Sequence, residues 1–264
     1  MDNKEENEHI KILEAGVSTW NAWRREHQSI RPNLRLAQLR GANLTEANLQ
    51  QADLFGASLS EADLAGANLS QADLYGATVF GANLEGASLA QADLSGAKLS
   101  GSNLSEADLV GTDLYGVIMY GGNLSWSDLS QANLHRACLV EASLFGTILV
   151  GANLEQADLV RADLSRSNLR DADMYGADLR EANLFGARLK RTDLYEAKLE
   201  KANLVNANLH EANLYGVSLF GTNFGGANLE EAHLEDIRYN TQTQWPEGFD
   251  PTEIDAVLID VDVD

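Results

Sequence analysis

The sequence predicts an all-β solenoid, in which short extended sides and tight corners stack into square coils around an apolar interior. Three observations support this fold class: leucine recurs at every fifth residue, alanine lies two places before it, and aromatic residues recur at intervals of twenty. A helix would spread a five-residue column around all of its sides, and an uninterrupted strand would turn every second leucine outward. The chain must therefore bend once in each group of five residues.

The leucine column runs from Leu34 to Leu234 without an insertion. Of its 41 positions, 37 are leucine, and 30 of the 40 positions between Ala37 and Ala232 are alanine. In Ala-(Asp/Asn)-Leu the outer two residues point inward and the polar one outward, as in an extended segment. The last two residues of each pentad must turn the chain. Eighteen of the 22 glycines fall at the second residue after the leucine, where a corner needs positive φ or a close backbone approach.

The spacing of the aromatic residues sets the size of the coil. Six of them lie twenty residues, or a multiple of twenty, apart: Phe55, Tyr75, Tyr115, Tyr175, Tyr195 and Tyr215. If four pentads make one coil, these side chains lie above one another and form one column, here called the aromatic column. A triangular coil of fifteen residues would scatter them. Residues 32–236 then make about ten coils, spaced by ~4.8 Å, which is the distance between hydrogen-bonded strands.

Runs such as GANLTEANLQQADLFGASLSEADLAGANLSQADL resemble the pentapeptide-repeat family, and the resemblance covers about three quarters of the chain. It implies a right-handed quadrilateral parallel β-helix, which agrees with the spacing of the columns. The segment GVSTWNAWRREHQSIRPNL also resembles the lead-in of many members of the family from photosynthetic bacteria.

The chain is expected to have three parts: an N-terminal helical cap (1–31), the solenoid (32–236), and a C-terminal cap with an acidic tail (237–264). Open solenoid ends expose strand edges and core leucines, which a cap would cover. An apolar stripe at spacings of three and four predicts one helix over residues 8–27 that lies on the first coil. Trp245 and Phe249 are expected to close the last coil.

The end of the chain, VLIDVDVD, alternates apolar and acidic residues. It pairs with a strand edge, joins a second subunit, or is disordered, and the sequence does not decide among these. A homodimer through an end of the rod or through this tail therefore stays open.

The formal net charge of −21 argues against direct binding of nucleic acid or of an anionic membrane. Cys138 is the only cysteine, so no intrachain disulfide can form. The N-terminus has no apolar signal segment, and no stretch is long enough to span a membrane. A cytoplasmic location is expected, with no cofactor.

No constellation of nucleophile, base and orienting group is recognisable, so the chain is not expected to be an enzyme. The five histidines are scattered and form no metal-binding motif. One column is acidic: Asp53, Asp73, Asp93, Asp113, Asp173 and Asp193. Solvated acids that cap turn amides are favoured over a Ca²⁺ site, because hard cations need six or more oxygen ligands. No metal site is therefore expected.

Charge is unevenly distributed along the repeats. Residues 41–134 hold eleven acids and one base, whereas residues 161–201 hold nine bases. Four of the latter are expected to share one face: Arg170, Arg188, Lys190 and Arg191. They could bind a phosphate or an acidic partner, but ion pairs with the nearby Asp171 and Glu211 are favoured.

The aromatic column has two interpretations. Exposed rings are enriched among the residues that anchor protein partners, but stacked rings also stabilise neighbouring strands. We expect a non-catalytic, rigid scaffold that binds an unidentified protein partner through the column. The family resemblance supplies an alternative, because some members, including the quinolone-resistance Qnr group, bind DNA gyrase and some of these mimic DNA. The acidic residues 41–134 fit an acidic mimic, whereas the basic residues 161–201 do not.

Overall fold

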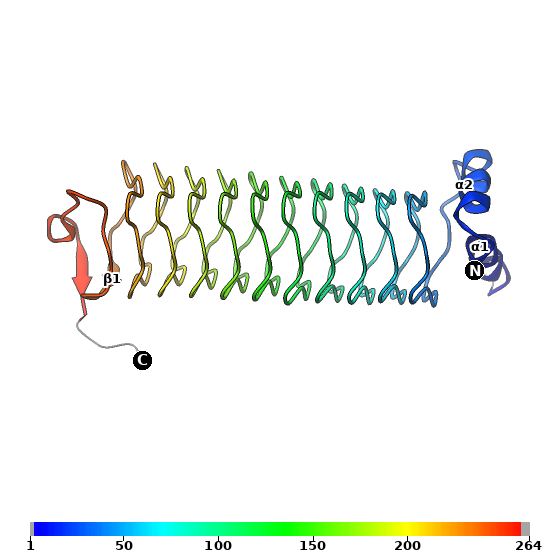
Figure 1. Cartoon of the computed structure of the whole chain (residues 1–264), viewed down its shortest axis with the longest axis horizontal. Helices are drawn as coiled ribbons and strands as arrows, with labels where there is room; N and C mark the ends of the chain where they lie inside the picture. The colour runs from blue at the N-terminus through cyan, green and yellow to red at the C-terminus, as the bar shows by residue number, and fades with distance from the viewer. Residues whose placement is uncertain (1–2, 260–264) are drawn as a thin grey trace.

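The computed structural model describes the backbone of residues 3–259 and the side chains of residues 8–259. It is a long rod with two helices at one end (Figure 1), and two short paired strands lie near the other end. The named elements are α1 (Asn3–Glu14), α2 (Val17–Glu26), β1 (Ile237–Tyr239), the 3₁₀ turn η1 (Pro251–Glu253) and β2 (Ala256–Leu258). Between α2 and β1 the chain winds into stacked coils. No helix in the described part of the chain is long and apolar enough to cross a membrane.

Each coil consists of four pentads. Parallel bridges join residues twenty apart at every fifth position, from the pair Asn33 and Asp53 to the pair Ser218 and Arg238. The coil of twenty residues, which the aromatic spacing predicts, is therefore confirmed. The last bridge, between Asn223 and Gln244, contains one additional residue.

The sides of the coils are shorter than ordinary strands, because a turn interrupts the chain in every pentad. Around one corner, the Leu54 N–H donates to the Asp73 carbonyl (2.7 Å) and the Gly56 N–H to the Tyr75 carbonyl (2.9 Å). The Ala57 N–H donates back to the Leu54 carbonyl (2.9 Å) and closes the turn. Only one residue in each side has the full bridge geometry, so the long strands of a conventional sheet do not form.

Every corner has the same left-handed backbone. The second residue after each inward position, from Leu36 to Asp236, has φ between 54° and 72°. Glycine occupies 18 of these corners and other residues occupy 23. A side chain in this region costs roughly 1–2 kcal/mol, but the corner N–H bonds to the next coil and the repeat keeps its register. The glycines therefore mark the corner without being required at each one.

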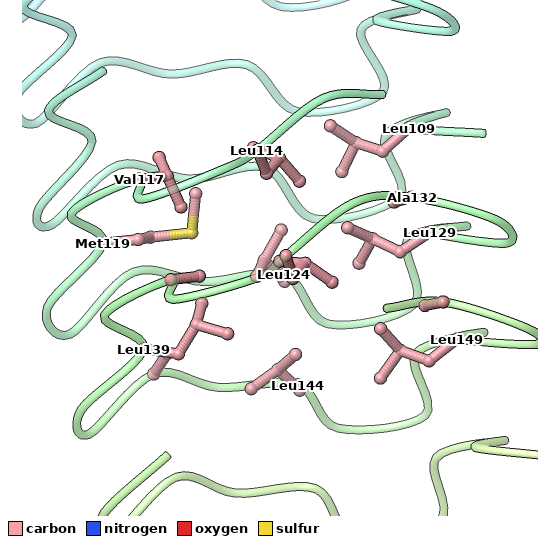
Figure 2. Close-up of a cluster of buried hydrophobic side chains, with 14 of the residues drawn as sticks. Leu109, Leu114, Val117, Met119, Leu124, Leu129, Ala132, Leu139, Leu144 and Leu149 are labelled. Carbon is pink, nitrogen blue, oxygen red and sulfur yellow. The ribbon is translucent and has the colours of Figure 1, made fainter. Parts of the chain in front are cut away.

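The leucines and alanines of the repeat form one continuous core. Leu109, Leu129 and Leu149 come from successive coils and lie in one column inside the rod (Figure 2). Burial of each such leucine contributes roughly 1.5–3 kcal/mol before entropy is subtracted. Met119 replaces a leucine where Gly122 replaces an alanine, and a Cβ at Gly122 would overlap the Met119 side chain. The larger inward residue is thus compensated by a smaller neighbour.

The N-terminal segment forms two helices, so the expectation of one helix over residues 8–27 is wrong. Gly16 breaks it with φ 109° and ψ 156°, a conformation that residues with a Cβ rarely adopt. Trp20 of α2 is fully buried, and its Nε1–H donates to the Asn48 carbonyl (2.8 Å). Arg24 donates to the Gln50 carbonyl (3.0 Å). The second helix is therefore attached to the first coil by side chains that bond to its backbone.

At the other end, aromatic rings lie against the final coil. Phe224 is fully buried and stacks on Trp245 at 5.4 Å, and Trp245 stacks on Phe249 at 5.0 Å. Strand β2 pairs in parallel with β1. The last five residues of the predicted acidic tail, 260–264, lie outside the described residues.

Candidate functional site

The C-terminal part of the aromatic column is a continuous stack. Tyr195 lies between Tyr175 and Tyr215, with ring centroids 5.5 and 5.2 Å apart and planes inclined by 18° and 3°. The outer two phenols donate to carboxylates of the neighbouring corners, Tyr175 to Glu196 (3.4 Å) and Tyr215 to Asp236. The negative charge of Glu196 raises the pKa of Tyr175, and the hydrogen bond to Asp236 raises the pKa of Tyr215. In this part of the column, all three rings and the hydroxyl groups of Tyr175 and Tyr215 have partners within the chain.

The N-terminal part consists of two shorter stacks. Phe55 and Tyr75 stack at 5.5 Å, and the guanidinium of Arg35 lies 4.1 Å above the other face of Phe55. Tyr115 stacks on His135 at 5.5 Å and 6°. His135 is not among the six residues predicted to form the column, because that prediction rests on phenylalanine and tyrosine alone. The structure places it in the stack.

Two positions interrupt the stacking of the column. Ser95 lies between Tyr75 and Tyr115. Glu155 lies beyond His135, and its carboxylate is 3.2 Å from the His135 Nδ1. Tyr75 is 50% and Tyr115 43% exposed, whereas the stacked Tyr195 is half-buried. The two most exposed tyrosines of the column therefore lie on either side of Ser95, and Tyr215, at the C-terminal end of the column, is 37% exposed.

The acidic column runs beside the aromatic column. Each of its six carboxylates accepts the backbone N–H two residues later, over distances from 2.8 Å at Asp93 to 3.3 Å at Asp53. Asp113 also accepts from the amide of Asn133 (2.9 Å). The acids thus cap the turns that carry the aromatic residues, which is the first of the two expectations for this column.

Of the four basic residues, three line one surface hollow of about 440 Å³: Arg170, Arg188 and Lys190. Asp171 bridges Arg170 (3.0 Å) and Arg191 (2.6 Å), and Glu211 pairs with Lys190 (3.2 Å). The hydrogen bond from Arg191 lowers the pKa of Asp171. Ion pairs within the face therefore engage three of the four basic side chains.

The coil also brings together a group that we did not expect from the sequence. Ligand atoms of His210, Glu211 and Glu231 all lie within 4.8 Å of one another. The signal was present, because residues 211 and 231 are one coil apart and His210 adjoins the first. Glu211 also pairs with Lys190, which supplies a cation at this position.

The chain is similar to proteins built from the same repeat. A family model described as pentapeptide repeats matches in 8 copies over residues 33–71, 72–114, 107–146, 147–186, 187–226 and 197–236. No curated protein matches the chain.

Among solved structures, the chain is 35% identical to HetL, a pentapeptide repeat protein from the cyanobacterium Nostoc sp. The match covers 81% of this chain and 91% of HetL, with a TM-score of 0.36. The chain is 31% identical to a pentapeptide repeat protein of the Arabidopsis thaliana thylakoid lumen, over 38% of this chain and 66% of that one, with a TM-score of 0.30. It is 17% identical to the plasmid-mediated fluoroquinolone resistance protein QnrB1, over 71% of this chain and 91% of QnrB1, with a TM-score of 0.42.

The family match extends over the coils described above. It agrees with the five-residue period and the coil of twenty. The chain therefore belongs to the pentapeptide repeat family.

Proposed function

We propose that this protein is a non-catalytic, rigid scaffold that binds another protein through the aromatic column, formed by Phe55, Tyr75, Tyr115, Tyr175, Tyr195 and Tyr215. One observation carries the proposal: half-exposed and exposed rings stand in register along one face of a rod. Large aromatic side chains are enriched among residues that dominate binding energy. A preorganised face also avoids much of the entropy that a flexible surface loses on binding.

The proposal also covers the coils, the caps, the location and the oligomeric state of the protein. The coils are right-handed and number about ten, and residues 1–31 and 237–264 flank the solenoid as caps. The contacts of Trp20 with the first coil and of Trp245 with the last one support the capping roles. We further propose a cytoplasmic location and no cofactor. A homodimer would form through an end of the rod or through the C-terminal tail.

The absence of an enzymatic role is supported by what the polar groups do. The six carboxylates of the acidic column are engaged as caps on turn amides, and Asp171 and Glu211 are engaged in ion pairs. A general acid or base needs an environment that matches its pKa to the reaction. Structural capping on an open surface does not supply one.

The proposal is tested by affinity capture from a lysate of the source organism. Wild type is compared with two triple serine variants, one at Phe55, Tyr75 and Tyr115 and one at Tyr175, Tyr195 and Tyr215. A third variant removes rings from the neighbouring column, at Phe80, Tyr120 and Phe220, as the matched control. All variants are first shown to melt as folded proteins.

A protein that wild type and the control retain, and that either column variant loses, would support the proposal. If both column variants capture the same proteins as wild type, the column only stabilises coils and the proposal is wrong.

The second candidate is an acidic DNA mimic that binds DNA gyrase or another DNA-binding protein. The net charge of −10 over residues 41–134 favours it. Arg35 and Arg40 neutralise Asp53 and Glu61 at the start of this region, which weakens it. A gyrase supercoiling assay at two salt concentrations tests it, because charge mimicry weakens as salt rises. Undiminished supercoiling at micromolar protein would exclude gyrase as the target.

A further inference from the structure

One ring is missing from the aromatic column at Ser95. This buried serine occupies the column position between the exposed Tyr75 and Tyr115, and the gap is here called the Ser95 notch. The two tyrosines are two coils apart, which corresponds to ~9.6 Å at the usual coil spacing. One further planar group would then lie about 5 Å from each ring, which is the spacing of the existing stacks.

The structure already shows which planar group fits this column. Arg35 occupies the same register position three coils earlier, with its guanidinium 4.1 Å above the ring of Phe55. Its Nη1 lies 3.2 Å from each carboxylate oxygen of Asp53. On its far face, Phe55 stacks on Tyr75. A guanidinium in this column is thus held by a ring below it and by a carboxylate beside it.

The Ser95 notch repeats this arrangement with one member missing. Three coils after Asp53 and Phe55 lie Asp113 and Tyr115, and Tyr115 stacks on His135 with its far face. Asp113 uses Oδ1 to cap its turn and to accept from Asn133, and no described cation lies within ion-pair distance of it. At position 95, the side chain that corresponds to Arg35 is a serine.

A second gap in the rod shows that ring spacing alone does not define the site. On the neighbouring column, Ser100 separates Phe80 and Tyr120, which are 54% and 50% exposed. There the residue that corresponds to Asp113 is Ile118, and its bridge partner in the preceding coil is Lys98. That gap has two rings but no carboxylate at the position of Asp113. The nearby Glu141 already accepts from the Tyr120 phenol and pairs with Arg161 (2.9 Å), so this gap complements a cation less well.

We propose that the Ser95 notch receives an arginine side chain from a partner protein, whose guanidinium stacks between Tyr75 and Tyr115 and pairs with Asp113. Arginine fits because its planar, delocalised cation stacks on rings and binds carboxylates through two donors. The net charge of −10 over residues 41–134 attracts a basic segment and repels nucleic acid. This inference rests on the proposed function and identifies the chemistry of the partner.

The test uses two blocked peptides, Gly-Gly-Arg-Gly-Gly and its lysine counterpart, titrated into the isotope-labelled full-length protein. We expect the arginine peptide to shift the amide signals of Tyr75, Tyr115 and Asp113, and to bind roughly five-fold more tightly than the lysine peptide. Ser95→Arg fills the notch from within the chain and should abolish this binding. Ser100→Arg adds the same charge beside the other gap and should leave most of it.

Asp113→Asn provides a variant that leaves the turn intact, since asparagine occupies the equivalent position at Asn133 and Asn213. It should weaken the arginine peptide and reduce its advantage over lysine. The inference would be overturned if the two peptides bound equally well or if neither bound. It would also be overturned if Ser95→Arg and Ser100→Arg weakened binding of the arginine peptide to the same extent. In affinity capture, Ser95→Arg could retain a protein that the column variants lose. That result would contradict the role of the Ser95 notch, but it would leave the proposed function intact.

Discussion

The two halves of the aromatic column are built from the same pentad and the same left-handed corner, yet they leave different surfaces. In the C-terminal half, Tyr195 is covered on both faces, and the outer phenols of Tyr175 and Tyr215 bond to carboxylates. In the N-terminal half, a serine separates Tyr75 from Tyr115.

This difference shows that the repeat determines where each surface side chain lies, whereas the identity of the residue after each leucine determines which groups that surface offers to a partner. Where aromatic residues follow one another at intervals of twenty, their rings stack on each other and stabilise the rod. Where the sequence omits one ring between two others, it leaves two planar surfaces and, at Asp113, a carboxylate oxygen available to a partner. We therefore expect the first half of the column to be the recognition surface, and the second half to contribute more to the stability of the rod.

The largest effect is expected from breaking the core that both halves share. Leu129 is fully buried between them, so Leu129→Asp places an unpaired charge inside the rod and should cost about 4 kcal/mol or more. Thermal unfolding and limited proteolysis of the central coils would report the loss. Gln131→Asp, at an exposed corner, is the matched control, because Asp171 and Asp236 already occupy such corners. An unchanged Tm for Leu129→Asp would contradict the inward position of the leucine column.

The next effect compares the continuous C-terminal stack with the N-terminal half of the column, which is interrupted at Ser95. Tyr195→Ser removes two stacking contacts, and Tyr115→Ser removes one. At about 0.5–1.5 kcal/mol for each aromatic pair, Tyr195→Ser should destabilise about twice as much as Tyr115→Ser. Paired chemical denaturation curves would measure both. If Tyr195→Ser lowered the free energy of unfolding by the same amount as Tyr115→Ser or by less, the continuous stack would not stabilise the rod.

A smaller effect, in the stabilising direction, is expected when the gap in the N-terminal half of the column is filled with a ring. Ser95→Tyr places a ring between Tyr75 and Tyr115 and should raise stability by about 0.5–1 kcal/mol. Ser105→Tyr is the control, because Glu85 and Ser125 precede and follow it in its own column. A rise in Tm confined to Ser95→Tyr is the expected result, and equal shifts in both variants would contradict the stacking account.

The smallest effect concerns pH in the C-terminal half. The hydrogen bond to Asp236 raises the pKa of Tyr215 above its ordinary value of 10.0, so the folded protein holds this proton more tightly than the unfolded chain does. The stabilisation is therefore complete below pH 10.0 and is lost as the pH rises through the raised pKa. Asp236→Asn should make this phenol ionise earlier, as measured by phenolate absorbance. The same substitution in a Tyr215→Phe background should change nothing, and a change there would assign the effect to another tyrosine.

Much of the fold follows from the sequence, because a strict period leaves few geometries. The inward leucines, the small residues beside them and the coil of twenty all come from counting, and the parallel bridges agree. The break at Gly16 was missed, since the apolar stripe continues across it and only the backbone conformation separates α1 from α2. The corners without glycine were predicted as bends, but their positive φ was not, because a glycine preference does not reveal that the other residues adopt the same backbone conformation.

Less of the candidate site was predictable. The column registers placed Tyr75 above Phe55, but they did not show that Arg35 lies on Phe55 or that His135 continues the stack from Tyr115. Those contacts depend on side-chain rotamers, which a period does not encode. The ion pairs of Asp171 were expected because opposite charges on adjacent coils are within reach of each other.

The most direct test of the aromatic column as a binding face compares two matched double variants in affinity capture. The double variant Tyr75→Ser and Tyr115→Ser removes both rings beside the Ser95 notch. The control, Phe80→Ser and Tyr120→Ser, removes two rings with the same spacing and similar exposure from the neighbouring column. We predict that the first pair loses a captured protein that the second pair and wild type retain. Retention of the same proteins, in the same amounts, by both pairs would contradict the claim that the column recognises a partner.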